Sequence, residues 1–303
     1  MDNSGKYINP FTDFGFKKLF GTEFNKELLI DFLNQVLGDK EHIKDLTYLN
    51  LENLGNLERD RRAIFDVYCE NEIGEKFIIE LQNVNQAYFK DRSIYYATFP
   101  IQSQAPKGSE WQYSLKTVYT ICILNFSFED GNNTSQCVRE VQLIDKKTNK
   151  VFYDKLMFIY LEMPRFNKAE DELVSRFDKW LYVIKNLNRL HDRPVKLQER
   201  VFQKLFKEAE IAKLKPKEME TYQESLKAYR DNQNTMEYAK SEARKEGLEE
   251  GLKEGLEEGL KEGIQQGEHI AKVETAKAMK QEGLSTKLIS KVTGLSVQEI
   301  AKL

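Results

Sequence analysis

Two carboxylates on a predicted β-hairpin, Asp66 and Glu80, are the residues of this chain best placed to do chemistry. They lie in the stretch 63–83, AIFDVYCENEIGEKFIIELQN, which we interpret as two strands joined by a tight loop. If residues 72–74 form a three-residue loop with its glycine in the left-handed position, Asp66 lies directly opposite Glu80. Gln82, two residues further along the second strand, then lies on the same face as both carboxylates.

The same register predicts that the other face of the hairpin belongs to the core. Consistent apolar cross-strand pairs stabilise a sheet, and here every pair on that face is apolar. The pairs are Phe65 with Leu81, Val67 with Ile79, and Cys69 with Phe77.

Two facing carboxylates require a compensating interaction. Directly opposed strand residues have Cβ atoms roughly 5 Å apart, and like charges at that distance destabilise the pair. A divalent cation would remove the repulsion, and hard oxygen ligands suit Mg²⁺ or Mn²⁺. The alternative is a solvent-exposed face on which the charges are hydrated, as for the neighbouring Glu70.

Apolar periodicity predicts the elements that must hold this hairpin. Strand-like and helix-like segments follow one another up to about residue 234, which is typical of an α/β or α+β domain. Residues 118–126, VYTICILNF, are nearly all apolar, as expected of a central strand covered on both faces. Further strands are predicted over 45–51, 138–144 and 151–162, and helices within 9–21 and over 22–37 (with Phe24 on its apolar face), 86–102, 170–187, 195–214 and 217–228.

A four-residue repeat, EGLEEGLKEGLEEGLKEGIQQG, fills residues 246–267. On a helix, each four-residue step advances about 40° beyond a full turn, so its apolar stripe is a slow spiral and not a heptad seam. Each glycine costs roughly 1 kcal/mol in a helix relative to alanine. We consider two interpretations: close helix–helix contact in a homo-oligomer, dimer or higher, and a flexible linker.

The last segment, 270–303, is predicted to form three short helices, with Ser285 and Ser296 as N-caps. Its spacing resembles a small helix-turn-helix, and its local excess of lysine would suit DNA. A packing or dimerisation module is the alternative.

Composition excludes several classes of site. The 303-residue chain has a net charge of −3, and its three cysteines and three histidines lack the spacing of a zinc site or a disulfide framework. It has no run of 18 apolar residues and no secretory signal at its start, so we expect a cytoplasmic protein without a membrane partner. Catalysis must therefore rely on carboxylates.

The hairpin carries Asp66 on its first strand and Glu80-Leu81-Gln82 on its second. This arrangement resembles the core of PD-(D/E)XK nucleases, in an E-x-Q variant. More specifically, the chain resembles the PD-(D/E)XK family transposase and recombination-promoting nuclease group, from about residue 7 to residue 187. The segments that carry the resemblance are TDFGFKKLFG, IFDVYCENEIGEKFIIELQ, FKDRSIYYAT, WQYSLKTVYTICILNF and LEMPRF.

The resemblance implies an α/β fold with a PD-(D/E)XK restriction-endonuclease-like core, a mixed central sheet flanked by helices, and an α-helical C-terminal extension. It also implies a magnesium-dependent DNA endonuclease linked to recombination or transposition. Asp66, Glu80 and the Leu81 backbone carbonyl would ligate Mg²⁺, for which Mn²⁺ could substitute, and the metal would activate water. Gln82 would complete the catalytic set.

Five side chains need separate treatment. Gln82 stands where the family signature has lysine; a neutral amide can orient water but cannot supply the positive charge. Asp13 matches an acidic position of the family and is a candidate third metal ligand, with a helix cap as the alternative. Lys17, Arg92 and Tyr95 are candidate nucleic-acid contacts; the alternatives are an exposed lysine and, for the aromatic side chains around Arg92 and Tyr95, a place in the core.

We therefore expect a nuclease-like domain with a helical appendage over 1–234, a repeat helix or linker over 235–269, and a small helical module over 270–303. The expected partner is DNA, with self-association through the tail. Two alternatives are a ribonuclease, and an inactive nuclease fold that serves as an oligomeric nucleic-acid- or protein-binding module.

Overall fold

The computed structural model covers residues 1–303 and describes residues 5–38, 43–49, 65–105, 112–129 and 136–303. These residues form two compact units, Met1–Gln233 and Asn234–Leu303. Among the described residues, no helix is long and apolar enough to cross a membrane.

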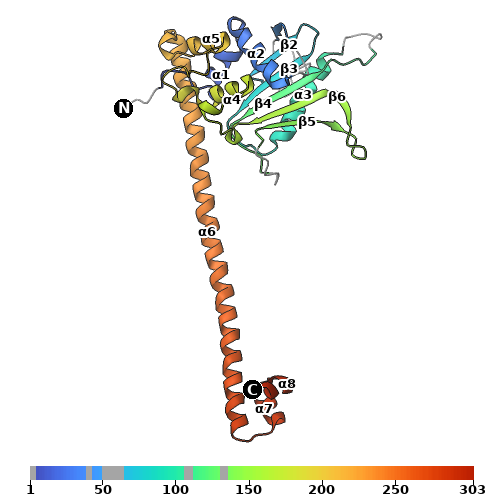
Figure 1. Cartoon of the computed structure of the whole chain (residues 1–303), viewed down its shortest axis with the longest axis vertical. Helices are drawn as coiled ribbons and strands as arrows, with labels where there is room; N and C mark the ends of the chain where they lie inside the picture. The colour runs from blue at the N-terminus through green and yellow to red at the C-terminus, as the bar shows by residue number, and fades with distance from the viewer. Residues whose placement is uncertain (1–4, 39–42, 50–64, 106–111, 130–135) are drawn as a thin grey trace, which may run out of the picture. The chain divides into compact units, whose positions relative to one another are not determined.

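A mixed six-stranded sheet forms the centre of the first unit, in the order β1-β2-β3-β4-β6-β5 (Figure 1). The first three strands are antiparallel, β3, β4 and β6 are parallel, and β5 returns antiparallel to β6. The α/β fold expected from the sequence is confirmed. The strands are β1 Leu46–Tyr48, β2 Val67–Asn71, β3 Lys76–Gln82, β4 Val118–Leu124, β5 Val138–Ile144 and β6 Val151–Glu162.

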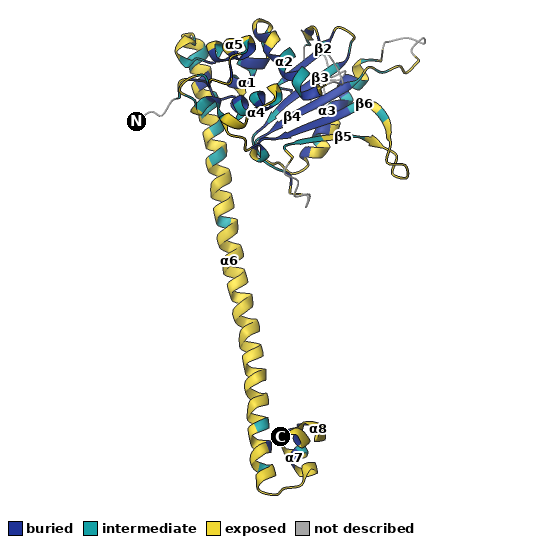
Figure 2. Cartoon of the chain, viewed as in Figure 1, coloured by how far each residue is buried: buried dark blue, intermediate teal, exposed yellow. Residues whose placement is uncertain are grey.

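Helices cover both faces of this sheet. One face packs against α1, α2, α4 and α5, and the other against α3 (Figure 1). Every residue of β4 is buried between these layers, which confirms the predicted central strand (Figure 2). The helices of this unit are α1 Asp13–Phe20, α2 Lys26–Leu37, α3 Phe89–Ser103, α4 Arg176–Asn186, α5 Arg200–Glu208 and the beginning of α6 Pro216–Gln281; short 3₁₀ helices span Glu23–Asn25, Met163–Arg165, Glu170–Glu172, Leu187–Arg189 and Ile211–Lys213.

The hairpin β2–β3 has the predicted register. Val67 pairs with Ile79 and Cys69 with Phe77, and Gly74 closes the loop at a φ of +85°, in the left-handed region that glycine adopts without strain. The prediction for Phe65 is wrong. Because β2 begins only at Val67, the alternation does not extend back to Phe65, whose ring packs on Tyr68 and on α3, across the sheet from Val67.

Two helix starts differ from the sequence prediction. Thr12, not Asp13, caps α1, because its hydroxyl accepts the Gly15 N–H; Asp13 is the first helical residue. The predicted helix 22–37 begins with a 3₁₀ turn, which rotates Phe24 out of the apolar face. Phe24 is 70% exposed and lies under the ammonium of Lys204.

The second unit consists of the rest of α6, α7 Thr286–Thr293 and α8 Val297–Lys302. The hydroxyls of Ser285 and Ser296 accept backbone N–H groups of Leu288 and Glu299, so both predicted N-caps are confirmed. The first of the three helices predicted within 270–303 is the end of α6. The glycine repeat is helical throughout, and α6 is exposed along most of its length (Figure 2). A small core joins the end of α6 to the two short helices: Ala276, Ile289, Leu295 and Ile300.

Candidate active site

Asp66 and Glu80 meet at the open end of the hairpin. Asp66 directly precedes β2, and its Oδ2 accepts the Leu81 N–H at 2.7 Å. This bond extends the hairpin beyond the last backbone pair and brings the Asp66 carboxyl beside that of Glu80, close enough for the two to share a proton. The Leu81 carbonyl belongs to the same strand, at the level where β3 pairs with Ile123 of β4.

Burial distinguishes this pair from hydrated surface charges. Glu80 is only 8% exposed, because its face of β3 lies under α3. The alternative of a simply hydrated face is therefore wrong for Glu80. Burial, and then the charge of Asp66, raise the pKa of Glu80 to about 9, against an opposing effect of Arg92. Burial also raises the pKa of Asp66, although the Leu81 N–H and Lys17 favour its charged form.

The raised pKa of Glu80 predicts a pH-dependent stability. The metal-free folded protein keeps a proton on Glu80 that the unfolded chain releases near its ordinary pKa of 4.5. The free energy of unfolding should therefore fall as pH rises from about 5 to about 9, because the unfolded state binds fewer protons there. Thermal unfolding in EDTA across this range should show a smaller decline for Glu80→Gln than for wild type. Glu70→Gln, on the same hairpin, is the control; equal declines in all three proteins would contradict the prediction.

Gln82 is hydrogen-bonded to a positively charged side chain. Its side-chain oxygen accepts a short hydrogen bond from Nη2 of Arg92, and its Nε2 donates to the Val84 carbonyl at 2.8 Å. Nη1 of Arg92 donates to Gln86 at 2.6 Å, so the guanidinium is held from two sides. Arg92 therefore places a positive charge beside Gln82, the position at which the family signature has lysine, and this charge opposes the rise in the pKa of Glu80.

Tyr96, which the sequence analysis did not single out, lies on the same side of α3 as Arg92. The guanidinium lies 5.8 Å from the centroid of the Tyr96 ring, and burial, followed by the charge of Glu80, raises the pKa of the Tyr96 hydroxyl. Tyr96 lies four residues after Arg92, and residues i and i+4 share one face of a helix. This spacing was the sequence signal that could have placed Tyr96 near the site. Tyr95 is 46% exposed and packs edge-to-face on Phe99.

Asp13 and Lys17 lie on α1, near Asp66. They form an ion pair with each other, with 2.6 Å between Lys17 Nζ and Asp13 Oδ1, and the charges of both act on Asp66. Within the described ranges, no three His, Cys, Asp or Glu side chains are grouped to hold a metal ion, so Asp13 does not join Asp66 and Glu80 in such a group.

The donors at this site fit a hard divalent cation. The buried carboxylate of Glu80 and the half-buried carboxylate of Asp66, each with a raised pKa, repel each other, and the ionised pair would gain most from a charge of +2 placed between them. Carboxylate and carbonyl oxygens are the ligands that such cations prefer. Asp66, Glu80 and the Leu81 carbonyl are the groups that would hold it.

A buried acid on β3 and a half-buried acid directly before β2, beside a fixed arginine at one end of a mixed sheet, are a nuclease-like arrangement. A comparison with protein families agrees with it: residues 10–239 match the model of the PD-(D/E)XK nuclease family transposases. The chain belongs to this family. The match supports a nuclease-like function on a nucleic-acid substrate, in a family whose members generally use divalent metals. No curated protein and no solved structure matches the chain.

Proposed function

We propose that this protein is a Mg²⁺-dependent endodeoxyribonuclease that hydrolyses DNA phosphodiester bonds and serves recombination or the movement of mobile elements. The observation that carries the proposal is the Asp66–Glu80 pair at the end of β3, with Glu80 buried and Asp66 half-buried, next to a glutamine held by Arg92. A cytoplasmic protein is consistent with the free state of all three cysteines.

Each side chain has a role in this proposal. Asp66 and Glu80 hold Mg²⁺, which when bound supplies an activated water and stabilises negative charge on the phosphate. The Leu81 N–H fixes the orientation of Asp66. Arg92 donates to the side-chain oxygen of Gln82, and the side-chain nitrogen of Gln82 donates to the Val84 carbonyl. The Gln82 amide is therefore oriented before the substrate binds, and it can position the attacking water. The guanidinium also places a positive charge beside the phosphate.

Plasmid nicking tests the proposal. The full chain should convert supercoiled DNA to the open-circular form with Mg²⁺ and not with EDTA. A single-stranded RNA should persist under the same conditions. Cleavage of the RNA alone would indicate a ribonuclease. Cleavage of neither substrate with Mg²⁺ or Mn²⁺ would overturn the enzymatic proposal in favour of a binding module.

We also propose that the repeat segment of α6 associates with the same segment of a second copy. Apolar side chains follow every glycine of the repeat but the last, and they are exposed. Apart from its chain neighbours and the nearby backbone of its own helix, a Cβ added at any of these glycines would meet no described atom within 4 Å, so a partner helix could approach the backbone closely. The exposed residues are Leu248, Leu252, Leu256, Leu260 and Ile264.

Light scattering of the full chain should give a multiple of the 35.5 kDa chain mass. The double substitution of Leu252 and Leu256 by serine should return it to the monomer mass, because it removes two neighbouring side chains from the apolar stripe. Substituting Glu250 and Glu254 by serine keeps the spacing on a polar part of the same helix and should leave the mass unchanged. A monomeric wild type would contradict self-association.

A further inference from the structure

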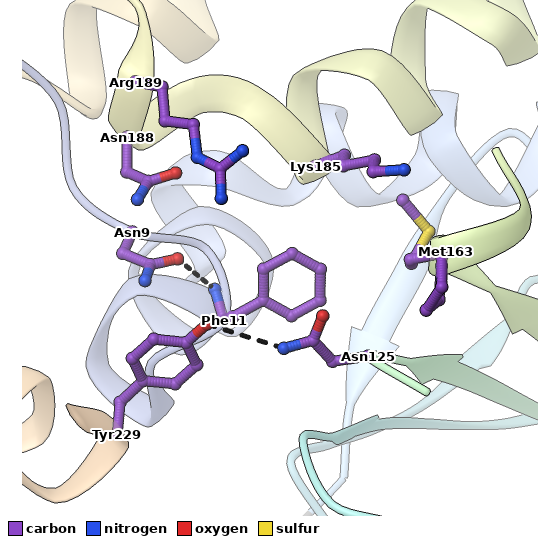
Figure 3. Close-up of a pocket in the computed structure, with 9 residues that line it drawn as sticks. Asn9, Phe11, Asn125, Met163, Lys185, Asn188, Arg189 and Tyr229 are labelled. Carbon is purple, nitrogen blue, oxygen red and sulfur yellow. Dashed lines mark hydrogen bonds between the residues drawn. The ribbon is translucent and has the colours of Figure 1, made fainter. Parts of the chain in front are cut away.

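A hollow of about 350 Å³ opens within the first unit (Figure 3). Phe11, Met163 and Tyr229, which line it, belong to the cluster on the face of the sheet opposite α3. It lies between the N-terminal segment, the ends of β4 and α4, and the beginning of α6. Its volume falls at the lower end of the range for small-molecule sites. Nine described residues line it: Asn9, Phe11, Asn125, Met163, Pro164, Lys185, Asn188, Arg189 and Tyr229.

The lining is cationic and rich in hydrogen-bond donors. None of the nine lining residues is acidic, and two of them, Lys185 and Arg189, are basic, although the chain as a whole has a net charge of −3. Arg189 is exposed, and no hydrogen bond or ion pair engages its guanidinium within the described part of the chain. Figure 3 shows this guanidinium pointing into the hollow.

The amides of Asn9 and Asn125 add uncharged donors to the hollow. Asn9 is almost fully buried, and its Oδ1 accepts the Phe11 N–H at 2.9 Å, which leaves its amide nitrogen to donate. The Asn125 amide lies 3.5 Å from the Tyr229 hydroxyl, a long bond that a better acceptor could replace. A site with several donors and no carboxylate suits an anion with several acceptor oxygens.

The electrostatics of Lys185 and Arg189 also favour a bound anion. Burial, and then the nearby charge of Arg189, lower the pKa of Lys185. Its ammonium is held at the edge of the hollow by the Phe166 carbonyl and by Asn167. Since the two cations disfavour each other, an anion bound between them would stabilise both charges.

Two direct bonds connect the hollow to the candidate active site. The backbone N–H of Asn125 donates to the Gln82 carbonyl at 2.9 Å, and the Asn83 amide donates to the Phe11 carbonyl at 2.8 Å. The lining is therefore fixed to the last residue of β3 and the residue that follows it. A strand of nucleic acid that crosses the carboxyl ends of β3 and β4 would pass both places.

We propose that this hollow binds a phosphate group of the substrate DNA strand, one or a few nucleotides away from the phosphate that is cut. The proposal rests on the nuclease function proposed above and adds to it a subsite that orients the strand. Arg189 supplies the main charged contact, and Asn9 and Asn125 supply amide donors. Lys185 contributes its charge from the edge of the site.

The test measures DNA binding separately from cleavage. Fluorescence anisotropy of a labelled duplex, with Ca²⁺ in place of Mg²⁺, gives the affinity of the full chain over a series of salt concentrations. Arg189→Gln should weaken binding about tenfold and reduce the slope of log affinity against log salt by about 0.9, as expected for one lost phosphate contact. Arg189→Lys should retain the slope. Since Arg189 is exposed, these variants should unfold at the wild-type temperature.

Arg200→Gln is the matched control. It removes the same charge from an exposed arginine of the same unit, in a hollow that also contains Glu27 and Asp31. Equal affinities and slopes for Arg189→Gln and Arg200→Gln would overturn the subsite, even if plasmid nicking confirmed the nuclease. Arg189-dependent binding without any nicking would support phosphate binding in the hollow and reject the nuclease. Failure of the wild type to bind DNA would overturn both.

Discussion

Glu80→Gln is expected to reduce Mg²⁺-dependent plasmid nicking at least about a thousandfold, equivalent to roughly 4 kcal/mol of transition-state stabilisation. The substitution keeps the shape of the side chain and removes the charge that would hold the cation. Asp66→Asn should have a similar effect, since Asp66 is the only partner carboxylate beside Glu80 that the described residues place at the end of β3.

The two substitutions should not be additive. When two residues act as one unit, removing either one abolishes most of the rate enhancement that both provide. The double variant should therefore be no more than a few-fold slower than either single variant. Glu70→Gln is the control, because it removes a carboxylate from the same hairpin where it pairs with Lys76, away from the site. First-order nicking rates at saturating Mg²⁺ provide the measurement. Near-wild-type rates for Glu80→Gln would remove the catalytic assignment.

Arg92→Gln is expected to lower the nicking rate about a hundredfold, within the range for losing one preorganised electrostatic donor. Two effects combine: the phosphate loses a positive charge, and the amide of Gln82 loses the donor that fixes its orientation. Gln82→Lys alone should also be slow, because a lysine there would lie against the guanidinium of Arg92 and repel it.

The double variant Gln82→Lys with Arg92→Gln distinguishes this account from a simple loss of DNA affinity. It moves the positive charge from α3 to β3, which is the place given by the family signature, and its nicking rate should exceed that of either single variant by about tenfold. Such a non-additive result is the mark of two directly interacting residues. Strictly additive losses would show that Arg92 does not act through Gln82. Arg200→Gln, with its charge change elsewhere, should nick at the wild-type rate.

Local sequence patterns were sufficient for the hairpin and for most elements. Alternating apolar residues and the glycine at position 74 predicted the register of β2 and β3, because a one-residue shift would move every core residue to the other face. The fully apolar run of β4 and the caps Ser285 and Ser296 were equally local signals. Positions at the edges of elements were less predictable. Phe65 and Phe24 were misplaced because the exact start of a strand or helix decides where a side chain points.

The sequence by itself thus determined the family, the order of strands and helices, and the two carboxylates that face each other. Only the tertiary structure decided what surrounds them. Arg92 is ten residues from Gln82 in sequence, and their bond depends on how α3 packs across the sheet. The cationic hollow combines Asn9, Asn125 and Arg189, three distant parts of the chain. Burial is the main cause of the raised pKa of Glu80. That burial arises only when separate elements pack together, and no local sequence pattern encodes such packing.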